Sequence, residues 1–156
     1  KAKDQASLKV FNILGYALTM DSPSKSKEYK FLGEQDFMVM SRDRLIAEAD
    51  KKIKSIVSDY TPPRETVFNL QGSKVMPVMI DILENLFELN KIKDHGMTVG
   101  KKLGFMLSGG NTNISQSLSE QNILNLEREV FIDLIQMPLT QNRIKHTLDT
   151  GKPLFN

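Results

Sequence analysis

The chain has 156 residues, of which 26% are charged and 40% are hydrophobic, and its formal net charge is +2. This is the composition of a globular protein rather than a disordered one. The net charge is too small to indicate the basic surface that is typical of a nucleic-acid-binding protein. The absence of cysteine excludes disulfides, thiolate metal sites and a cysteine nucleophile.

The first third of the chain predicts two helices and one strand-like run. Apolar residues at intervals of three and four predict a helix over residues 6–19, apolar over much of its circumference. After a break, Ser22 or Ser24 can cap a short helix that runs through Leu32. Residues 37–40, Phe-Met-Val-Met, form the only strand-like run.

Residues 43–60 form the clearest amphipathic helix. Two prolines end it, because proline disfavours helix in the residue before it. Its lysines form the only candidate basic cluster for nucleic acid, and acidic residues flank them. Its apolar residues form one stripe: Leu45, Ile46, Ala49, Ile53, Ile56, Val57 and Tyr60.

Two further helices are predicted beyond a connection. Ser73 can cap a helix to about residue 90, and another helix spans residues 94–108 and stops at Gly109-Gly110. Phosphate-cradling glycines precede a helix, whereas these follow one, so we interpret them as a C-cap. The predicted inner face of the first of these helices consists of Met76, Met79, Ile80, Leu83 and Phe87.

The last two helices carry local end signals. Ser117 and Glu120 match a capping box, and the final helix has Thr140 as N-cap and Gly151 as C′ residue. Its predicted buried positions are Ile144 and Leu148. The chain is therefore predicted to be mostly α, with six or seven helices and at most one short strand.

Few residues suit catalysis or metal binding. Asp94 could orient the imidazole of His95, but adjacent residues on a helix do not face each other. We favour capping by Asp94 and a surface or hydrogen-bonded His95. The carboxylates of Glu127 and Glu129 diverge, and His95 and His146 are the only histidines. We predict no catalytic, cofactor-binding or metal-binding residue.

Gly100 and Gly104 have the spacing that permits close helix contact. Tight packing of soluble helices is the expected reason for this spacing. Lys101 and Lys102 lie between the two glycines and could meet a phosphate, although a solvated face is the stronger expectation.

The ends of the chain give expectations about its origin. No apolar run approaches the roughly 20 residues of a membrane-spanning helix, and the first residues lack the apolar core of a signal peptide. We therefore expect a cytoplasmic protein with no membrane span. The first residue is lysine rather than methionine, so we expect a chain cut from a longer one.

Several segments occur in the order found in one known family. They are residues 119–121, 124–131 and 140–146, the terminal Thr-Gly-Lys-Pro-Leu-Phe-Asn of residues 150–156, and, upstream, residues 32–49 and the Tyr-Thr-Pro-Pro of residues 60–63. Together they resemble the C-terminal end of bacterial 3-hydroxyacyl-CoA dehydrogenases that are fused to an enoyl-CoA hydratase region.

The resemblance implies a parent enzyme of fatty-acid β-oxidation that hydrates trans-2-enoyl-CoA and oxidises 3-hydroxyacyl-CoA with NAD. It also implies a multi-helix C-terminal domain at 73–156, a connection at 61–72, and a tail of the hydratase region at 1–60. The chain lacks a G-x-G-x-x-G sequence and a glycine-rich oxyanion segment. NAD and acyl-CoA are therefore implied for the parent enzyme only, and this part alone is expected to be inactive.

The expected role of the chain is structural. Its expected partners are the upstream catalytic domains of the same chain and a second copy in a homo-oligomer. A weaker hypothesis is that Lys101, Lys102 or Phe105 touches the CoA nucleotide. The alternative is a free-standing helical interaction module. The coding sequence upstream of Lys1 would distinguish this module from a part of a longer enzyme.

Overall fold

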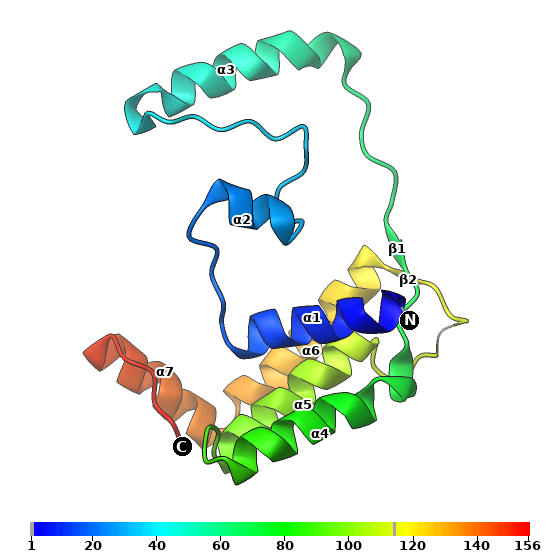
Figure 1. Ribbon diagram of the computed structural model, residues 1–156, viewed down its shortest axis with the longest axis vertical. Coiled ribbons are helices and arrows are strands. Elements are labelled where there is room, and N and C mark those ends of the chain that lie inside the picture. The colour runs from blue at the N-terminus through cyan, green and yellow to red at the C-terminus, as the bar shows by residue number, and fades with distance from the viewer. Residues whose placement is uncertain (1, 114) are drawn as a thin grey trace. The chain divides into compact units, whose positions relative to one another are not determined.

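The computed structural model describes residues 2–113 and 115–156, with side chains from residue 6 onward. The described residues contain seven α-helices, three short 3-10 helices and one two-stranded sheet (Figure 1). The prediction of a mostly α fold is thereby confirmed. Among these residues, no helix combines the length and apolar character that crossing a membrane requires.

The chain divides into two compact units that differ from the ranges predicted from the sequence. Unit 1 consists of Lys1–Leu18 and Glu65–Asn156, and unit 2 consists of Thr19–Arg64. The start of the chain joins the later helices because Phe11 of α1 (Ala2–Gly15) belongs to their hydrophobic core. Assignment of residues 1–60 to a hydratase tail stays a prediction.

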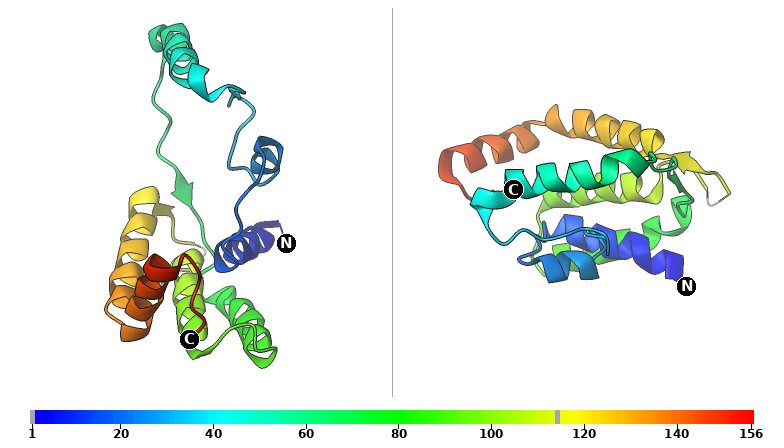
Figure 2. Two further views of the ribbon diagram at one scale, coloured as in Figure 1. Left: turned by 90° about the vertical axis from the view of Figure 1, so that its left-hand side faces the viewer. Right: turned by 90° about the horizontal axis from the view of Figure 1, so that it is seen from above.

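Three helices build most of unit 1. These are α4 (Met76–Glu88), α5 (Asp94–Ser108) and α6 (Glu120–Ile135), and α5 lies between the other two (Figure 2). The α1 helix packs against α5. The buried core of unit 1 is formed by Phe11, Val75, Met79 and Leu83.

Two glycines let α5 approach α4 closely. A Cβ atom on Gly100 would lie 2.4 Å from Cδ2 of Leu83, and one on Gly104 would lie 3.2 Å from the sulfur of Met76. A side chain at Gly100 would have to displace the buried Leu83, and one at Gly104 would press on the side chain of Met76. The predicted tight helix packing is confirmed.

The glycines after α5 end that helix. Gly109 is the C-cap, with φ of 93°, and Gly110 has φ of 67°, so both have the left-handed conformation that favours glycine. The N–H of Gly110 donates to the carbonyl of Phe105 over 2.8 Å. The C-cap interpretation is confirmed.

The start of α4 differs from the prediction. Ser73 lies in a short 3-10 turn, η3 (Gly72–Lys74), and does not cap α4. Val75 is the N-cap, without a side-chain hydrogen bond, and Pro77 lies in the first turn as expected. Of the predicted inner face, Met79 and Leu83 are buried and Phe87 is exposed.

The two short strands lie where neither was predicted. β1 (Val67–Phe68) pairs antiparallel with β2 (Leu118–Ser119), whereas residues 37–40 form no strand. The prediction for residues 37–40 is wrong, because no described strand pairs with them. Val67 and Phe68 anchor the connection before α4 to the segment before α6.

The capping box of α6 lies two residues later than predicted. Ser119 accepts from the N–H of Asn122, and the side chain of Asn122 accepts from the N–H of Ser119. Ser117 instead donates to the side-chain oxygen of Asn69 over 2.9 Å. The extended backbone of β2 prevents the helix from starting before Glu120.

The last helix, α7 (Pro138–Thr150), follows α6 along one side of unit 1 (Figure 2). Met137 is its N-cap, so the prediction of Thr140 is wrong, whereas Gly151 ends the helix as predicted, with φ of 67°. Ile144 and Leu148 are 42% and 81% exposed. Their predicted burial is wrong because they lie on the face of α7 that the described residues leave uncovered.

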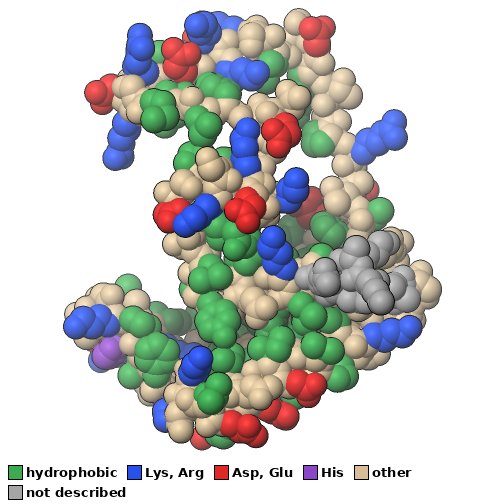
Figure 3. Space-filling view, viewed as in Figure 1, with side chains coloured by type: hydrophobic (Ala, Val, Ile, Leu, Met, Phe, Trp, Pro, Cys, Tyr) green, Lys and Arg blue, Asp and Glu red, His purple; other side chains and the backbone are tan. Residues whose placement is uncertain are grey.

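Unit 2 has two helices and no buried side chain. α2 (Pro23–Glu28) is capped by Ser22, as predicted, but it ends before Leu32. α3 (Leu45–Ile56), with the 3-10 turns η1 (Arg42–Arg44) and η2 (Val57–Asp59) at its ends, covers the amphipathic helix predicted at 43–60. Hydrophobic side chains lie exposed along α3 (Figure 3).

Candidate functional site

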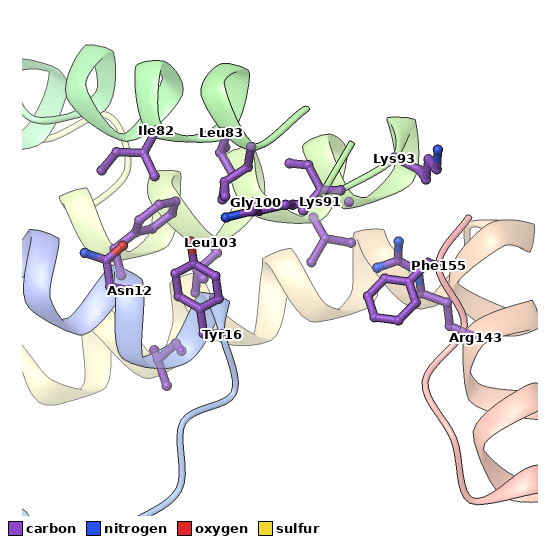
Figure 4. Close-up of a pocket in the computed structure, with 17 residues that line it drawn as sticks. Asn12, Tyr16, Ile82, Leu83, Lys91, Lys93, Gly100, Leu103, Arg143 and Phe155 are labelled. Carbon is purple, nitrogen blue, oxygen red and sulfur yellow. The ribbon is translucent and has the colours of Figure 1, made fainter. Parts of the chain in front are cut away.

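A cavity of about 390 Å³ opens in unit 1 between α1, the α4–α5 connection, α5, α7 and the C-terminal segment (Figure 4). Its volume falls within the range of small-molecule sites. The cavity is bounded by Phe11, Asn12, Leu14, Gly15, Tyr16, Ile82, Leu83, Leu86, Lys91, Ile92, Lys93, Gly96, Val99, Gly100, Leu103, Arg143 and Phe155.

The walls of the cavity are mostly apolar. Phe11 and Leu83 belong to the buried core, and Leu103 packs against that core. Gly100 has no side chain, so the methyl groups of Leu83 pack directly on the surface of α5 at this point. The cavity is therefore an extension of the core that opens to the surface.

Three cationic side chains border the cavity, and no described aspartate or glutamate does. Lys91 extends across the cavity toward Asn12 and Tyr16, whereas Lys93 points away from the other labelled side chains (Figure 4). No described aspartate or glutamate forms a salt bridge with Lys91, Lys93 or Arg143. The cavity thus combines apolar walls with three cationic side chains.

Arg143 is held by the end of the chain. Its Nε donates to Oδ1 of Asn156 over 2.7 Å, and its Nη2 donates to the backbone oxygen of Asn156 over 3.1 Å. Nδ2 of Asn156 donates in turn to the carbonyl of Leu139 over 3.1 Å. Burial lowers the pKa of Arg143 from its ordinary value, but a guanidinium stays charged at neutral pH.

His95 is buried behind this arginine and is 3% exposed. Its Nε2 lies 2.8 Å from Oγ1 of Thr140, so one of the two atoms donates to the other. Burial, and then the charge of Arg143, lower the pKa of His95 from 6.5. The neutral imidazole links α5 to α7, as the hydrogen-bonded interpretation expected.

Asp94 does not act with this histidine in the structure. It is exposed in the first turn of α5, where Lys93 is the N-cap, so capping by Asp94 is wrong. No hydrogen bond between Asp94 and His95 is present among the described residues. The arrangement can bind a molecule, but the described residues around the cavity include no paired acid and base.

The residues suggested for CoA lie elsewhere. Lys101 and Phe105 do not border the cavity, and Nζ of Lys102 is 2.6 Å from a carboxylate oxygen of Asp133 on α6. Reasoning from the sequence missed Lys91 and Arg143. Lys91 and Lys93, on either side of the apolar Ile92, were a weak signal of a cationic site. Nothing in the sequence spacing linked them to Arg143, which lies far along the chain.

A second apolar groove of about 600 Å³ is more open. Glu127 and Arg128 lie at its edge, so these charges border a surface groove instead of forming a paired-carboxylate site. Within the described part of the chain, no group of three His, Asp or Glu side chains could hold a metal ion. The groove is lined by Leu14, Val99, Leu103, Met106, Leu124, Glu127, Arg128, Val130, Phe131 and Leu134.

One known protein is similar over almost the whole chain. The chain is 26% identical over 152 residues to a probable 3-hydroxyacyl-CoA dehydrogenase of Bacillus subtilis (strain 168). The match covers 97% of this chain but 19% of that protein, so the chain spans about a fifth of its relative's length. No family model and no solved structure matches the chain. The predicted resemblance to 3-hydroxyacyl-CoA dehydrogenases is confirmed.

Proposed function

We propose that the chain is the C-terminal helical part of a fatty-acid β-oxidation enzyme with 3-hydroxyacyl-CoA dehydrogenase and enoyl-CoA hydratase activities. Its role there is structural: it packs against the catalytic domains of the same polypeptide and contributes to contacts between subunits. The similarity to a dehydrogenase over 97% of the chain supports this assignment. The enzyme works in the cytoplasm.

The proposed structural role rests mainly on the apolar stripe of α3. Leu45 and Ile53 of α3 are 52% and 60% exposed, and Val57 at the start of the following turn η2 is 65% exposed. No side chain of unit 2 is buried, so this unit has no core of its own. An apolar face without a core to cover it is typical of a surface that binds another protein domain.

The chemistry is assigned to other parts of the polypeptide. NAD is bound by a parallel sheet with a glycine-rich turn before a helix, and the described strands are one antiparallel pair of two residues each. These residues do not fit the nucleotide, so no catalytic step is assigned to this chain.

The test uses the longer polypeptide encoded by the same reading frame. We expect it to reduce NAD with a 3-hydroxyacyl-CoA and to lose stability when Ile53→Asp places a charge on the α3 stripe. Lys51→Asp, on the opposite face of the same helix, is the matched control and should have little effect. Thermal unfolding and NADH absorbance measure the two properties.

Two results would contradict the proposal. One is a reading frame that begins next to Lys1, which would favour a free-standing interaction module. The other is a longer enzyme in which Ile53→Asp and Lys51→Asp have the same effect, because the α3 stripe would then contact nothing.

A further inference from the structure

We propose that residues 37–40, Phe-Met-Val-Met, add a strand to the edge of a β-sheet in the longer polypeptide. The run lies between α2 and α3 in unit 2. Its partner has a defined chemistry, which is an edge strand with unpaired backbone N–H and C=O groups. The inference rests on the proposed function to the extent that the chain must be part of a longer protein.

Two hydrogen-bonded turns flank the run but do not include it. Before the run, the N–H of Asp36 donates to the carbonyl of Gly33 over 3.3 Å. After the run, the N–H of Arg44 donates to the carbonyl of Ser41 over 3.2 Å. No backbone hydrogen bond joins residues 37–40 to any other described residue. Such a row of unpaired N–H and C=O groups is a template for pairing with another strand.

The side chains of the run favour a strand and do not protect it from pairing. Aromatic and β-branched residues such as Phe37 and Val39 are enriched in strands. Proteins usually protect an exposed strand edge with lysine or proline, whereas this run contains no charged residue and no proline. Met38 and Met40 are 52% and 96% exposed. An uncharged run of this kind aggregates readily when it stays uncovered, which favours a permanent partner.

Helix α3 lies beside the run and continues the same surface. The chain reverses near η1, so α3 runs back past residues 37–40 (Figure 1). Nζ of Lys52 lies 5.8 Å from the centroid of the Phe37 ring, which places the two elements next to each other. A strand with an amphipathic helix beside it is one part of a layer of helices packed on a sheet. The apolar stripe of α3 would then cover one face of the sheet that the run joins.

The described part of the chain offers no sheet of matching length. Its strands, β1 and β2, have two residues each and pair with each other. A second copy could offer the same four residues, but an isolated pair of strands is only marginally stable in water. The chain matches 19% of its Bacillus subtilis relative, so most of that relative's length lies outside the match. We therefore assign the partner strand to the remaining part of the longer polypeptide.

Amide hydrogen exchange tests this pairing in the 156-residue chain and in the longer polypeptide of the same reading frame. Peptides that cover residues 36–41 report on the run. We expect the run to exchange rapidly in the chain alone and about tenfold more slowly, or slower still, in the longer polypeptide. The reason is that pairing with a strand protects amides that water reaches freely in the chain alone.

Proline variants separate backbone pairing from side-chain contacts. A strand at a sheet edge donates to its partner from alternate residues only, and proline removes one N–H group. In the longer polypeptide, one of Met38→Pro and Val39→Pro should therefore speed exchange of the run about tenfold, and the other should change it less than about twofold. Met38→Ala and Val39→Ala are the matched controls, because they shorten the side chain and keep the N–H group. In the 156-residue chain, all four variants should leave thermal unfolding unchanged.

Three results would overturn the pairing. They are rapid exchange of the run in both proteins, equal effects of the two proline variants, and slow exchange in a dimer of the 156-residue chain, which would assign the partner to a second copy. An active longer polypeptide that Ile53→Asp destabilises would keep the proposed function even if the run stayed unpaired. Conversely, a protected run with alternating proline effects would keep the pairing even if the longer polypeptide were inactive.

Discussion

Replacement of Gly100 by alanine tests directly how closely α5 packs on α4. The new Cβ would lie 2.4 Å from Cδ2 and 2.9 Å from Cδ1 of Leu83, well inside ordinary van der Waals contact. Leu83 is 5% exposed and belongs to the core with Met79, so it has little room to move. The substitution therefore overpacks the centre of unit 1.

Two opposing effects set the size of the change. Overpacking a core costs about 1–3 kcal/mol, whereas alanine stabilises a helix interior by about 1 kcal/mol over glycine. We expect Gly100→Ala to lower the free energy of unfolding by about 1 kcal/mol. In a Leu83→Ala background the clashing methyl groups are absent, so the same substitution should raise the free energy of unfolding by about 1 kcal/mol.

Urea unfolding followed by circular dichroism measures all four members of this double-mutant cycle. Gly15→Ala is the control, because a Cβ there meets nothing within 4 Å, and it should not destabilise the protein. The steric reasoning would be refuted by a Gly100→Ala effect that has the same sign and size with and without the Leu83 side chain.

Three further predictions concern pH, a turn and an ion pair. Burial lowers the pKa of His95 from 6.5, so the unfolded state binds the proton first as the pH falls. The free energy of unfolding should therefore decrease below pH 6.5 and level off below the folded-state pKa, and urea titrations of His95→Gln should lack this slope. Gly72→Ala should lower the free energy of unfolding by more than about 2 kcal/mol, because φ is +58° and the Cβ would lie 1.8 Å from the oxygen of Thr112; thermal unfolding checks it. Lys102→Met should change the stability by less than about 1 kcal/mol, because its bond to Asp133 is partly exposed, and added salt should reduce the difference.

Local signals predicted the helices well. The bounds of α5 were predicted from periodicity and from Gly109, because glycine is the residue that ends a helix at a positive φ. Gly151 and Ser22 were identified for similar reasons. Each of these positions depends on a few neighbouring residues, which is the information that a single sequence contains.

Features that depend on distant contacts could not be predicted in the same way. The pairing of β1 with β2 moved the capping box to Ser119, and the spacing of Ser117 and Glu120 gave no warning of it. Thr140 has a typical N-cap position in the sequence, but its hydroxyl binds His95 instead. The cavity likewise joins Lys91 to a residue of α7 that periodicity alone could not place beside it.

The central proposal is that this chain packs on the other domains of a longer polypeptide through the apolar stripe of α3. Amide hydrogen exchange of α3 (Leu45–Ile56) measures this most directly, in the 156-residue chain and in the longer polypeptide. We predict rapid exchange in the chain alone and much slower exchange in the longer polypeptide, with α5 protected in both. Equal exchange of α3 in the two proteins would contradict the claim.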